Sequence, residues 1–248
     1  MRKLRFECVE MQTDILVIGS GLAGLWSSIC LADKDQDVVL ISKSFLGAGS
    51  NTCLSGAAFT ASGPDFDHSD HERLFFSNGQ GLLDKHSKLV EQVVQNGERE
   101  IDELSIKTGL NFKYIKGGRY ELDTEPNVTI PGGKLVFSLA NIVRASRIKI
   151  IEHATVFSLL KEDGKIWGAT GCLSQGDPFK IIAKATILAT GGYASCLSRN
   201  DNSKRICGDG HLLAFNSGGL LRDLEFIQFY PLGMDEIFLP SYLVDYPF

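Results

Sequence analysis

The chain has 248 residues, of which 44% are hydrophobic and 22% charged, and its formal net charge at pH 7 is −5. This composition is ordinary for a globular protein, and the length suits one large core or two smaller ones. The net negative charge does not predict the basic surface that binds nucleic acid. No apolar run reaches the roughly 18 residues of a membrane span. Residues 1–7 lack the apolar stretch of a secretory signal, so we expect a cytoplasmic protein.

The cysteines and histidines predict no metal centre. The six cysteines include no CxxC pair, and without a secretion signal we interpret them as reduced thiols. His68 and His71 lie in the polar stretch 65–72, where we expect a solvated loop rather than a metal site, because no thiolate or second histidine cluster lies nearby.

Residues 13–43 predict a strand, a glycine turn, a helix and a second strand. The apolar run 15–18 leads directly into Gly19-Ser20-Gly21-Leu22-Ala23-Gly24, residues 25–32 suit a helix, and residues 38–41 form a second apolar run. In such a βαβ unit the glycines allow a tight turn, close approach of a pyrophosphate and close helix packing. The helix start offers free N–H groups to the anion. The pattern predicts a dinucleotide site, with an unliganded glycine turn as the alternative.

The middle of the chain predicts a helical region. The small, polar loop 43–58 can lie close to a ligand, or it is an ordinary surface loop. Residues 62–110 predict helices, divided at Gly97, with apolar residues at a 3.6 period. These apolar residues are Leu89, Val93, Val94, Ile101 and Leu104. Residues 111–123 predict a hairpin, and Pro131-Gly132-Gly133 precedes a helix at 135–146.

Strands dominate the next segment. We expect strands at 148–151, 155–161, 165–172 and 179–183, the second and third forming a hairpin across Glu162-Asp163-Gly164. A further core strand, 185–189, ends in Thr190-Gly191-Gly192 and can reach the ligand of the first glycine turn. These elements predict an α/β fold with a central parallel sheet and an added antiparallel β-meander.

The last segments contain one acidic helix start and one alternating stretch. Asp209 stands where a helix begins, and it either caps that helix or holds a ligand hydroxyl. Residues 223–231 alternate between polar and apolar types, as a strand does.

Several motifs occur in one order along the chain, at residues 15–24, 41–44, 189–192, 208–210 and 223–229. Together they resemble the flavoprotein family of fumarate reductase, succinate dehydrogenase and L-aspartate oxidase. The resemblance is good over residues 12–60 and 185–232 and weaker between them. It implies a Rossmann-like fold and FAD as the cofactor.

The resemblance also implies a domain organisation, with residues 1–248 forming a single FAD-binding domain. Its parts are a dinucleotide unit at 12–61, a helical insert at 62–146, a β-meander at 148–183 and a flavin-side segment at 185–232. Family members are longer and carry a capping domain after the tail motif. We therefore expect the capping domain to be absent or truncated after about residue 235.

The family's cofactor contacts carry over to matching positions of this sequence. The resemblance implies pyrophosphate contacts at the glycine turn, ribose contacts after the second strand and a backbone contact to the adenine region from Val156. It also implies flavin contacts from the loop, from the end of the last strand and from Asp209. These positions are Gly19, Ser20, Gly21, Ala23, Gly24, Ser42, Lys43, Ser50, Asn51, Thr52, Ser55, Gly56, Ala57, Val156, Thr190, Gly191 and Asp209.

Two departures from the family pattern bear on the chemistry. Some members attach FAD through a histidine near the position of Ser50, so we expect non-covalent FAD here. The family usually has a histidine where this chain has Tyr230, and a tyrosine offers a dicarboxylate only a hydrogen bond. Gln228 and Tyr230 are the substrate-side candidates, and no catalytic residue is assigned.

The sequence therefore leaves more than one function open. The first is an FAD-dependent oxidoreductase that transfers a hydride between flavin N5 and a small substrate such as a carboxylic acid. The alternative is a non-catalytic FAD-binding fragment, or a subunit that needs a partner chain to complete the active site. A nicotinamide dehydrogenase is a third, although Ser42 stands where such enzymes carry an acidic ribose ligand.

Overall fold

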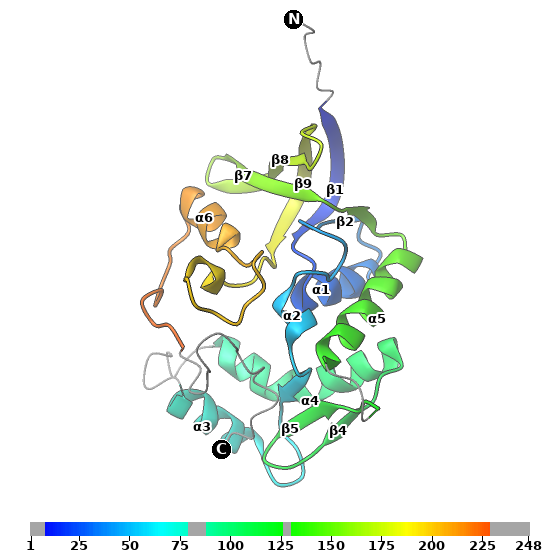
Figure 1. Cartoon of the computed structure of the whole chain (residues 1–248), viewed down its shortest axis with the longest axis vertical. Coiled ribbons are helices and arrows are strands. Elements are labelled where there is room, and N and C mark those ends of the chain that lie inside the picture. The colour runs from blue at the N-terminus through cyan, green and yellow to red at the C-terminus, as the bar shows by residue number, and fades with distance from the viewer. Residues whose placement is uncertain (1–7, 79–87, 126–129, 229–248) are drawn as a thin grey trace, which may run out of the picture. The chain divides into compact units, whose positions relative to one another are not determined.

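The computed structural model describes residues 8–78, 88–125 and 130–228. Its contacts divide the chain into two compact units. The sheet unit comprises the chain up to Leu54 and Val136–Arg222, and the helical unit comprises Ser55–Leu135 and the chain from Asp223. Figure 1 labels the helices and strands of both units.

The sheet unit is built on a six-stranded sheet with the strand order β6-β2-β1-β9-β8-β7. The first four strands in this order run parallel, and β9, β8 and β7 pair antiparallel. The bounds are β1 Val9–Ile18, β2 Val38–Ile41, β6 Lys149–Ile151, β7 Ala154–Glu162, β8 Lys165–Leu173 and β9 Pro178–Leu188. The predicted α/β fold with a central parallel sheet and an antiparallel addition is confirmed.

The pairing register brings three strand ends to one edge. Ile18 is opposite Ile41 of β2 on one side and Leu188 of β9 on the other. Parallel strands align their carboxyl ends in this way, and ligands of open α/β sheets bind just beyond them.

The core of this unit lies against the sheet. Leu16, Val39, Phe179 and Ile181 are at most 2% exposed, and they form one apolar cluster with Leu213. Helix α1 (Leu22–Ala32) packs against β1 and β2, and helix α6 (Asp209–Asn216) packs beside β7 (Figure 1). Removing these side chains from water stabilises the sheet that positions the strand ends.

Two details of this sheet differ from the prediction. Strand β9 is continuous from Pro178 to Leu188, where two strands were predicted, because it pairs with β1 along almost its whole length. Strand β6 belongs to the parallel part of the sheet through β2, so it lies outside the meander. The remaining short elements are α2 (Asn51–Leu54) and a 3-10 turn at Ala194–Cys196.

The helical unit combines helices with a three-stranded antiparallel sheet of order β3-β5-β4. Its bounds are α3 His68–Asn78, α4 Lys88–Thr108, β3 Ala58–Thr60, β4 Phe112–Tyr114 and β5 Arg119–Leu122. Helix α5 (Pro131–Ala145) begins in this unit and ends in the sheet unit. The predicted hairpin is confirmed as β4 and β5, and α5 begins at Pro131, because proline is well suited to a first helical position.

Helix α4 corrects the prediction at Gly97 and at its apolar face. The helix passes through Gly97 without a break, and a Cβ there would lie 3.1 Å from the Cβ of Ala61. The glycine therefore serves close packing. Leu89 and Val93 are exposed, whereas Val90 and Val94 are buried, so the inward face is rotated from the predicted one.

The expected solvated loop at residues 65–72 is wrong. Asp67 and Asp70 exchange hydrogen bonds between side chain and backbone N–H, which caps α3 at its start. His71 is 1% exposed and lies between the rings of Phe66 and Phe75. These aromatic neighbours explain why His71 is buried, although the residues next to it in the sequence are polar.

The tail and the surface give three further observations. The strand expected at residues 223–231 is wrong for its described part, because residues 223–228 form no strand. Tyr230 lies outside the described residues.

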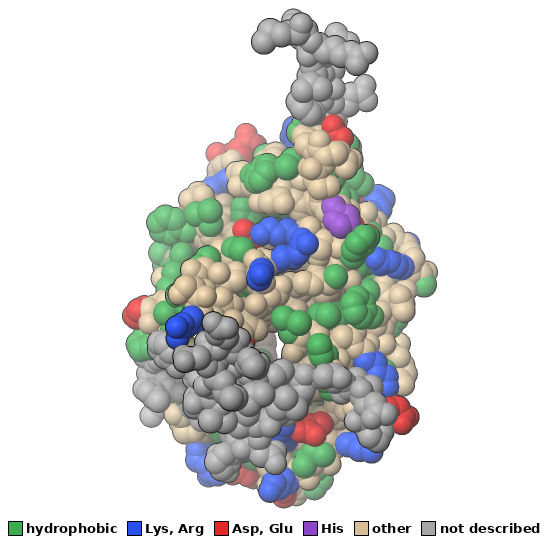
Figure 2. Space-filling model, viewed as in Figure 1, with side chains coloured by type: hydrophobic (Ala, Val, Ile, Leu, Met, Phe, Trp, Pro, Cys, Tyr) green, Lys and Arg blue, Asp and Glu red, His purple; other side chains and the backbone are tan. Residues whose placement is uncertain are grey.

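No helix among the described residues combines the length and apolar character needed to cross a bilayer. The cytoplasmic location stays a prediction. On the face drawn in Figure 2, basic and acidic side chains are interspersed with apolar and uncharged ones.

Candidate functional site

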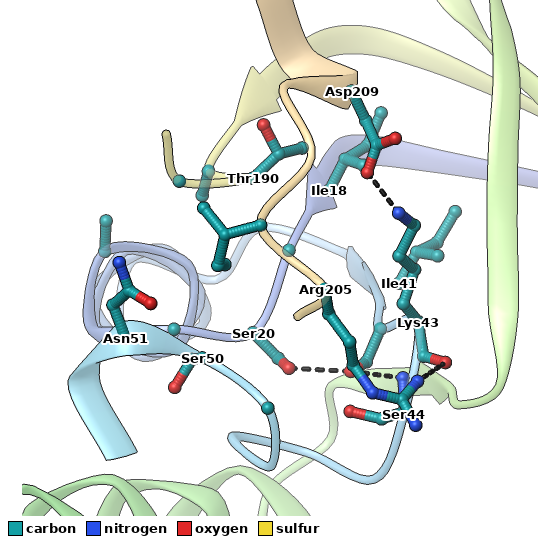
Figure 3. Close-up of a pocket in the computed structure, with 18 of the residues that line it drawn as sticks. Ile18, Ser20, Ile41, Lys43, Ser44, Ser50, Asn51, Thr190, Arg205 and Asp209 are labelled. Carbon is teal, nitrogen blue, oxygen red and sulfur yellow. Dashed lines mark hydrogen bonds and ion pairs between the residues drawn. The ribbon is translucent and has the colours of Figure 1, made fainter. Parts of the chain in front are cut away.

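A cavity of about 370 Å³ opens beyond the carboxyl ends of β1, β2 and β9. Ile18, Ile41 and Leu188, the last residues of those strands, all line it. The segments that follow the strands supply most of the remaining wall (Figure 3). The cavity lies where an open α/β sheet is expected to bind its ligand, and its volume falls within the range of cofactor sites.

The glycine turn after β1 is shaped by close backbone approaches. Gly19 has a φ of +110°, and a Cβ there would lie 2.3 Å from the carbonyl oxygen of Ala189. A Cβ at Gly24 would lie 1.8 Å from the carbonyl oxygen of Gly19, so no side chain fits between α1 and the turn. Gly21 differs, because the nearest atoms to a Cβ there are Thr52 Oγ1 at 3.5 Å and Ser50 Cβ at 3.6 Å. The protein therefore leaves space beside Gly21 that a ligand in the cavity can occupy.

The N-terminus of α1 meets the cavity. The lining includes Gly21, Leu22 and Ala23. The N-cap residue, Gly21, has no side chain with which to cap the helix, and the first turn contains no acidic residue. The Leu22 N–H donates to Thr52 Oγ1 at 3.0 Å. The rest of this first turn carries the partial positive charge of a helix start, which favours an anion, and a phosphate suits this end of the cavity.

Hydroxyl groups join the glycine turn to the end of β2. Ser20 Oγ and Ser42 Oγ are 2.7 Å apart, and the Gly47 N–H donates to Ser20 Oγ at 3.1 Å. Ser42 is only 2% exposed, although it borders the cavity. Its hydroxyl therefore holds the protein framework together, in addition to the ribose contact implied by the resemblance.

An ion pair crosses the cavity wall. Lys43 Nζ, just after β2, contacts a carboxylate oxygen of Asp209 at the start of α6, as Figure 3 shows. The two side chains are 32% and 35% exposed. Helix α6 is capped at Gly208, which has a φ of +79°, without a side-chain hydrogen bond, so the structure does not show the capping role considered for Asp209.

Arg205 is the principal lining residue that sequence reasoning missed. Its Nη1 donates to the carbonyl oxygen of Lys43 at 3.3 Å, and its Cδ would lie 2.7 Å from a Cβ at Gly49. Arg205 lies in a polar loop that carries no recognisable motif, so only the tertiary structure brings it beside Lys43. Two cationic side chains therefore line this wall, with the Lys43 ammonium at Asp209 and the Arg205 guanidinium at the Lys43 carbonyl oxygen (Figure 3).

Most of the predicted cofactor positions gather around this cavity. Those that line it are Gly19, Ser20, Gly21, Ala23, Ser42, Lys43, Ser50, Asn51, Thr52, Val156, Thr190, Gly191 and Asp209. Gly24 lies in the helix packing contact behind it, and Ser55, Gly56, Ala57 and Gln228 belong to the helical unit. The lining residues that were not predicted are Ile18, Leu22, Ile41, Ser44, Ala48, Gly49, Ala154, Leu188, Ala189, Arg205, Ile206 and Leu213.

The lining suits a dinucleotide with a fused ring system. Backbone N–H groups and two cationic side chains in the wall are donors of the kind that phosphate oxygens accept, and its hydroxyls are of the kind that bind sugar oxygens. Val156 and Ile206 are apolar lining residues, and apolar walls are typical of sites that hold flat rings. FAD fits this set of residues in chemical type.

Comparison with known proteins agrees with this geometry. The profile of the "FAD binding domain" family matches residues 14–244. An uncharacterised FAD-dependent oxidoreductase of Methanocaldococcus jannaschii is 30% identical over 237 residues, which are 90% of this chain and 43% of that protein. L-Aspartate oxidase of Clostridium acetobutylicum is 31% identical over 240 residues, which are 91% of this chain and 53% of that protein.

Solved structures show the same fold. An E. coli quinol fumarate reductase chain aligns with a TM-score of 0.73 and 22% identity over 84% of this chain and 37% of its own. A flavocytochrome c3 fumarate reductase gives a TM-score of 0.73 at 21% identity, covering 84% and 40%. The chain spans about half the length of the curated relatives it matches.

The family match extends over most of the chain, and the glycine turn, strand ends and cavity fit the cofactor that the family binds. The chain therefore belongs to the FAD-binding-domain family of flavoproteins, with FAD as its cofactor.

Proposed function

We propose that this chain forms the FAD-binding part of an oxidoreductase that transfers a hydride between flavin N5 and a small organic acid. The observation that carries the proposal is a single cavity lined by the glycine turn, the α1 N-terminus and the segment after β9. Bound FAD would supply the redox chemistry, because its N5 accepts or donates a hydride. The chain's own residues bind and orient it.

The pyrophosphate is proposed to lie at the start of α1. Gly21 leaves room for the phosphates, and the N–H groups of the first helical turn that follow Leu22 would donate to them. Lys43 and Arg205 add positive charge at the cavity wall. Because phosphate oxygens are acceptors, these donors favour the diphosphate over an uncharged ligand of the same shape.

The flavin side is proposed to be held by two segments. Ser50, Asn51 and Thr52 come from the loop before and within α2, and Thr190 and Gly191 follow β9. Asp209 adds a carboxylate that can accept a hydrogen bond from a ribityl hydroxyl while it is paired with Lys43.

The attachment of FAD is proposed to be non-covalent. Residues 43–58 contain no histidine that could carry a flavin bond. FAD would then be retained by hydrogen bonds, charge and apolar contacts alone. It would leave intact when the protein is denatured in acid.

The substrate proposal rests on the relatives, which include L-aspartate oxidases and fumarate reductases. A carboxylic acid is therefore the class to test first. Tyr230 replaces the family's usual histidine, and a neutral phenol attracts a second carboxylate less than an imidazolium does. Monocarboxylic acids belong in the same screen, as does a partner chain that completes the substrate side.

The first experiment is the visible spectrum of the purified chain before and after incubation with FAD and removal of excess cofactor. Retained flavin bands, with intact FAD released by acid, would support the site. A protein that ignores FAD would overturn it. Reduction of the bound flavin by a panel of organic acids then tests the chemistry, and flavin that binds but is reduced only with a partner chain would support the subunit alternative.

A further inference from the structure

Two cysteines meet in the loop that borders the cofactor cavity. Cys196 Sγ donates to the carbonyl oxygen of Cys207 at 3.3 Å. Beside them, the N–H and Oγ of Ser195 both donate to the carbonyl oxygen of Ile206, at 3.2 and 2.7 Å. Ser195 Oγ also donates to Cys207 Sγ at 3.5 Å. Residues eleven apart in the chain are thus held against each other through both backbone and side chains.

These two thiols differ from most other cysteines of the chain in their accessibility. Cys196 and Cys207 are exposed and free, whereas Cys30, Cys53 and Cys172 are partly buried. Burial raises the pKa of the Cys53 thiol, which lowers its thiolate fraction and its reactivity. Cys8 is exposed as well, but it lies just before β1, away from the loop in sequence. Cys196 and Cys207 are therefore two exposed cysteines that a direct hydrogen bond, from one thiol to the backbone of the other residue, holds next to each other.

We propose that Cys196 and Cys207 form a reversible redox pair that closes a disulfide in the presence of a peroxide. One sulfur attacks the peroxide, the O–O bond breaks, and a sulfenic acid and water are formed. The second sulfur then attacks the sulfenic sulfur, the S–S bond forms, and a second water leaves. Two thiols are oxidised and one peroxide is reduced, and a thiol reductant restores the starting state.

The bridge would act on the cavity through the residues it encloses. Residues 197–206 lie between the two cysteines, and among them Arg205 and Ile206 line the cavity. A disulfide that ties both ends of this loop restricts its opening. FAD would consequently leave the oxidised protein more slowly, by about threefold or more. This second effect rests on the proposed FAD site, whereas formation of the bridge does not.

The test treats the purified chain with hydrogen peroxide, blocks the remaining thiols and digests the protein with trypsin without reduction. Cleavage after Lys184, Arg199, Arg205 and Arg222 releases peptides 185–199 and 206–222, each with one cysteine. The expected product is these two peptides joined, about 2 Da lighter than their sum, and separated by reductant. Four of the six thiols should remain titratable.

Serine variants make the assignment specific. Cys196→Ser and Cys207→Ser should each abolish the joined peptide, whereas Cys8→Ser, an exposed control, should retain it. The proposed disulfide would be overturned if all six thiols remained after peroxide treatment or if the cysteines were oxidised directly to sulfonic acid. It would also be overturned by a bridge to any other cysteine or by a bridge between two chains. A bridge that forms while the FAD release rate stays unchanged would overturn its control of the cavity.

Discussion

The side-chain oxygens of Ser20 and Ser42 lie 2.7 Å apart, and this hydrogen bond joins the glycine turn after β1 to the end of β2. Both hydroxyls are buried, and the N–H groups of Gly47 and Ser44 donate to them from the following loop. The bond therefore fixes two walls of the cavity relative to each other.

Ser42→Ala tests this connection. Removal of the hydroxyl leaves buried donors with fewer partners, so the free energy of unfolding should fall by about 1–2 kcal/mol. Urea unfolding measures it. Ser27→Ala is the matched control, because the partners of Ser27 Oγ are carbonyl oxygens of its own helix, those of Ala23 and Gly24. Its cost should stay within about 0.5 kcal/mol, and equal costs at both positions would contradict the assignment.

Two glycines of the turn should respond differently to the same substitution. A Cβ at Gly21 meets ordinary contact distances within the protein, so Gly21→Ala should fold normally but weaken FAD binding by about tenfold or more, because the methyl group occupies ligand space. Gly24→Ala places a Cβ 1.8 Å from the Gly19 carbonyl oxygen, and should lower the melting temperature. Calorimetry and flavin titration separate the effects. A Gly21→Ala protein that binds FAD normally would show that the phosphates lie elsewhere.

The Lys43–Asp209 pair should matter more for FAD than for folding. Each side chain is about a third exposed, and pairs with such access to water contribute about 1 kcal/mol or less to stability. Lys43→Met should therefore change the urea midpoint little but weaken FAD binding several-fold, and increasingly so at low salt. Comparison with Asp209→Asn and the double variant measures the coupling. A large loss of stability in Lys43→Met would instead show that the ion pair serves mainly to stabilise the fold.

Arg205 is expected to contribute to cofactor affinity despite its exposed position. Arg205→Gln removes a charge from the cavity wall and should raise the dissociation constant for FAD by about 3–10-fold. Arg199→Gln is the matched control, since it removes the same charge from the same loop at a residue that does not line the cavity. Equal effects would indicate general electrostatic attraction rather than a contact at the wall.

His71 should make the stability of the chain depend on pH. Burial lowers the pKa of this imidazole, and the neighbouring His68 lowers it further. In the unfolded chain the pKa is about 6.5, so the unfolded state gains a proton first as the pH falls. Stability is then full above about pH 6.5 and declines below it until the folded-state pKa is reached, at up to about 1.4 kcal/mol per pH unit.

The measurement is the urea midpoint of the wild type and of His71→Phe between about pH 7.5 and 5, a range in which most carboxylates stay ionised. The variant retains an aromatic ring between Phe66 and Phe75 but cannot titrate. Its midpoint should vary less with pH. An identical slope in both proteins would place the pH dependence at other groups.

Elements whose pattern is short-range could be predicted from the residues alone. The glycine turn after the run 15–18, the hairpin at 155–172 and the βαβ spacing could all be predicted, because strand periodicity, turn chemistry and glycine geometry act over a few neighbouring residues. The resemblance that these motifs carry indicated about half of the positions that line the cavity.

Features that depend on contacts between distant segments became visible in the folded chain alone. Pairing with β1 made β9 one long strand, close packing on Ala61 gave Gly97 its role, and two aromatic rings buried His71. Arg205 reached the cavity, and Cys196 reached Cys207, through loops without any periodic pattern. Burial and long-range contact are properties of the folded chain, and local residue types do not specify them.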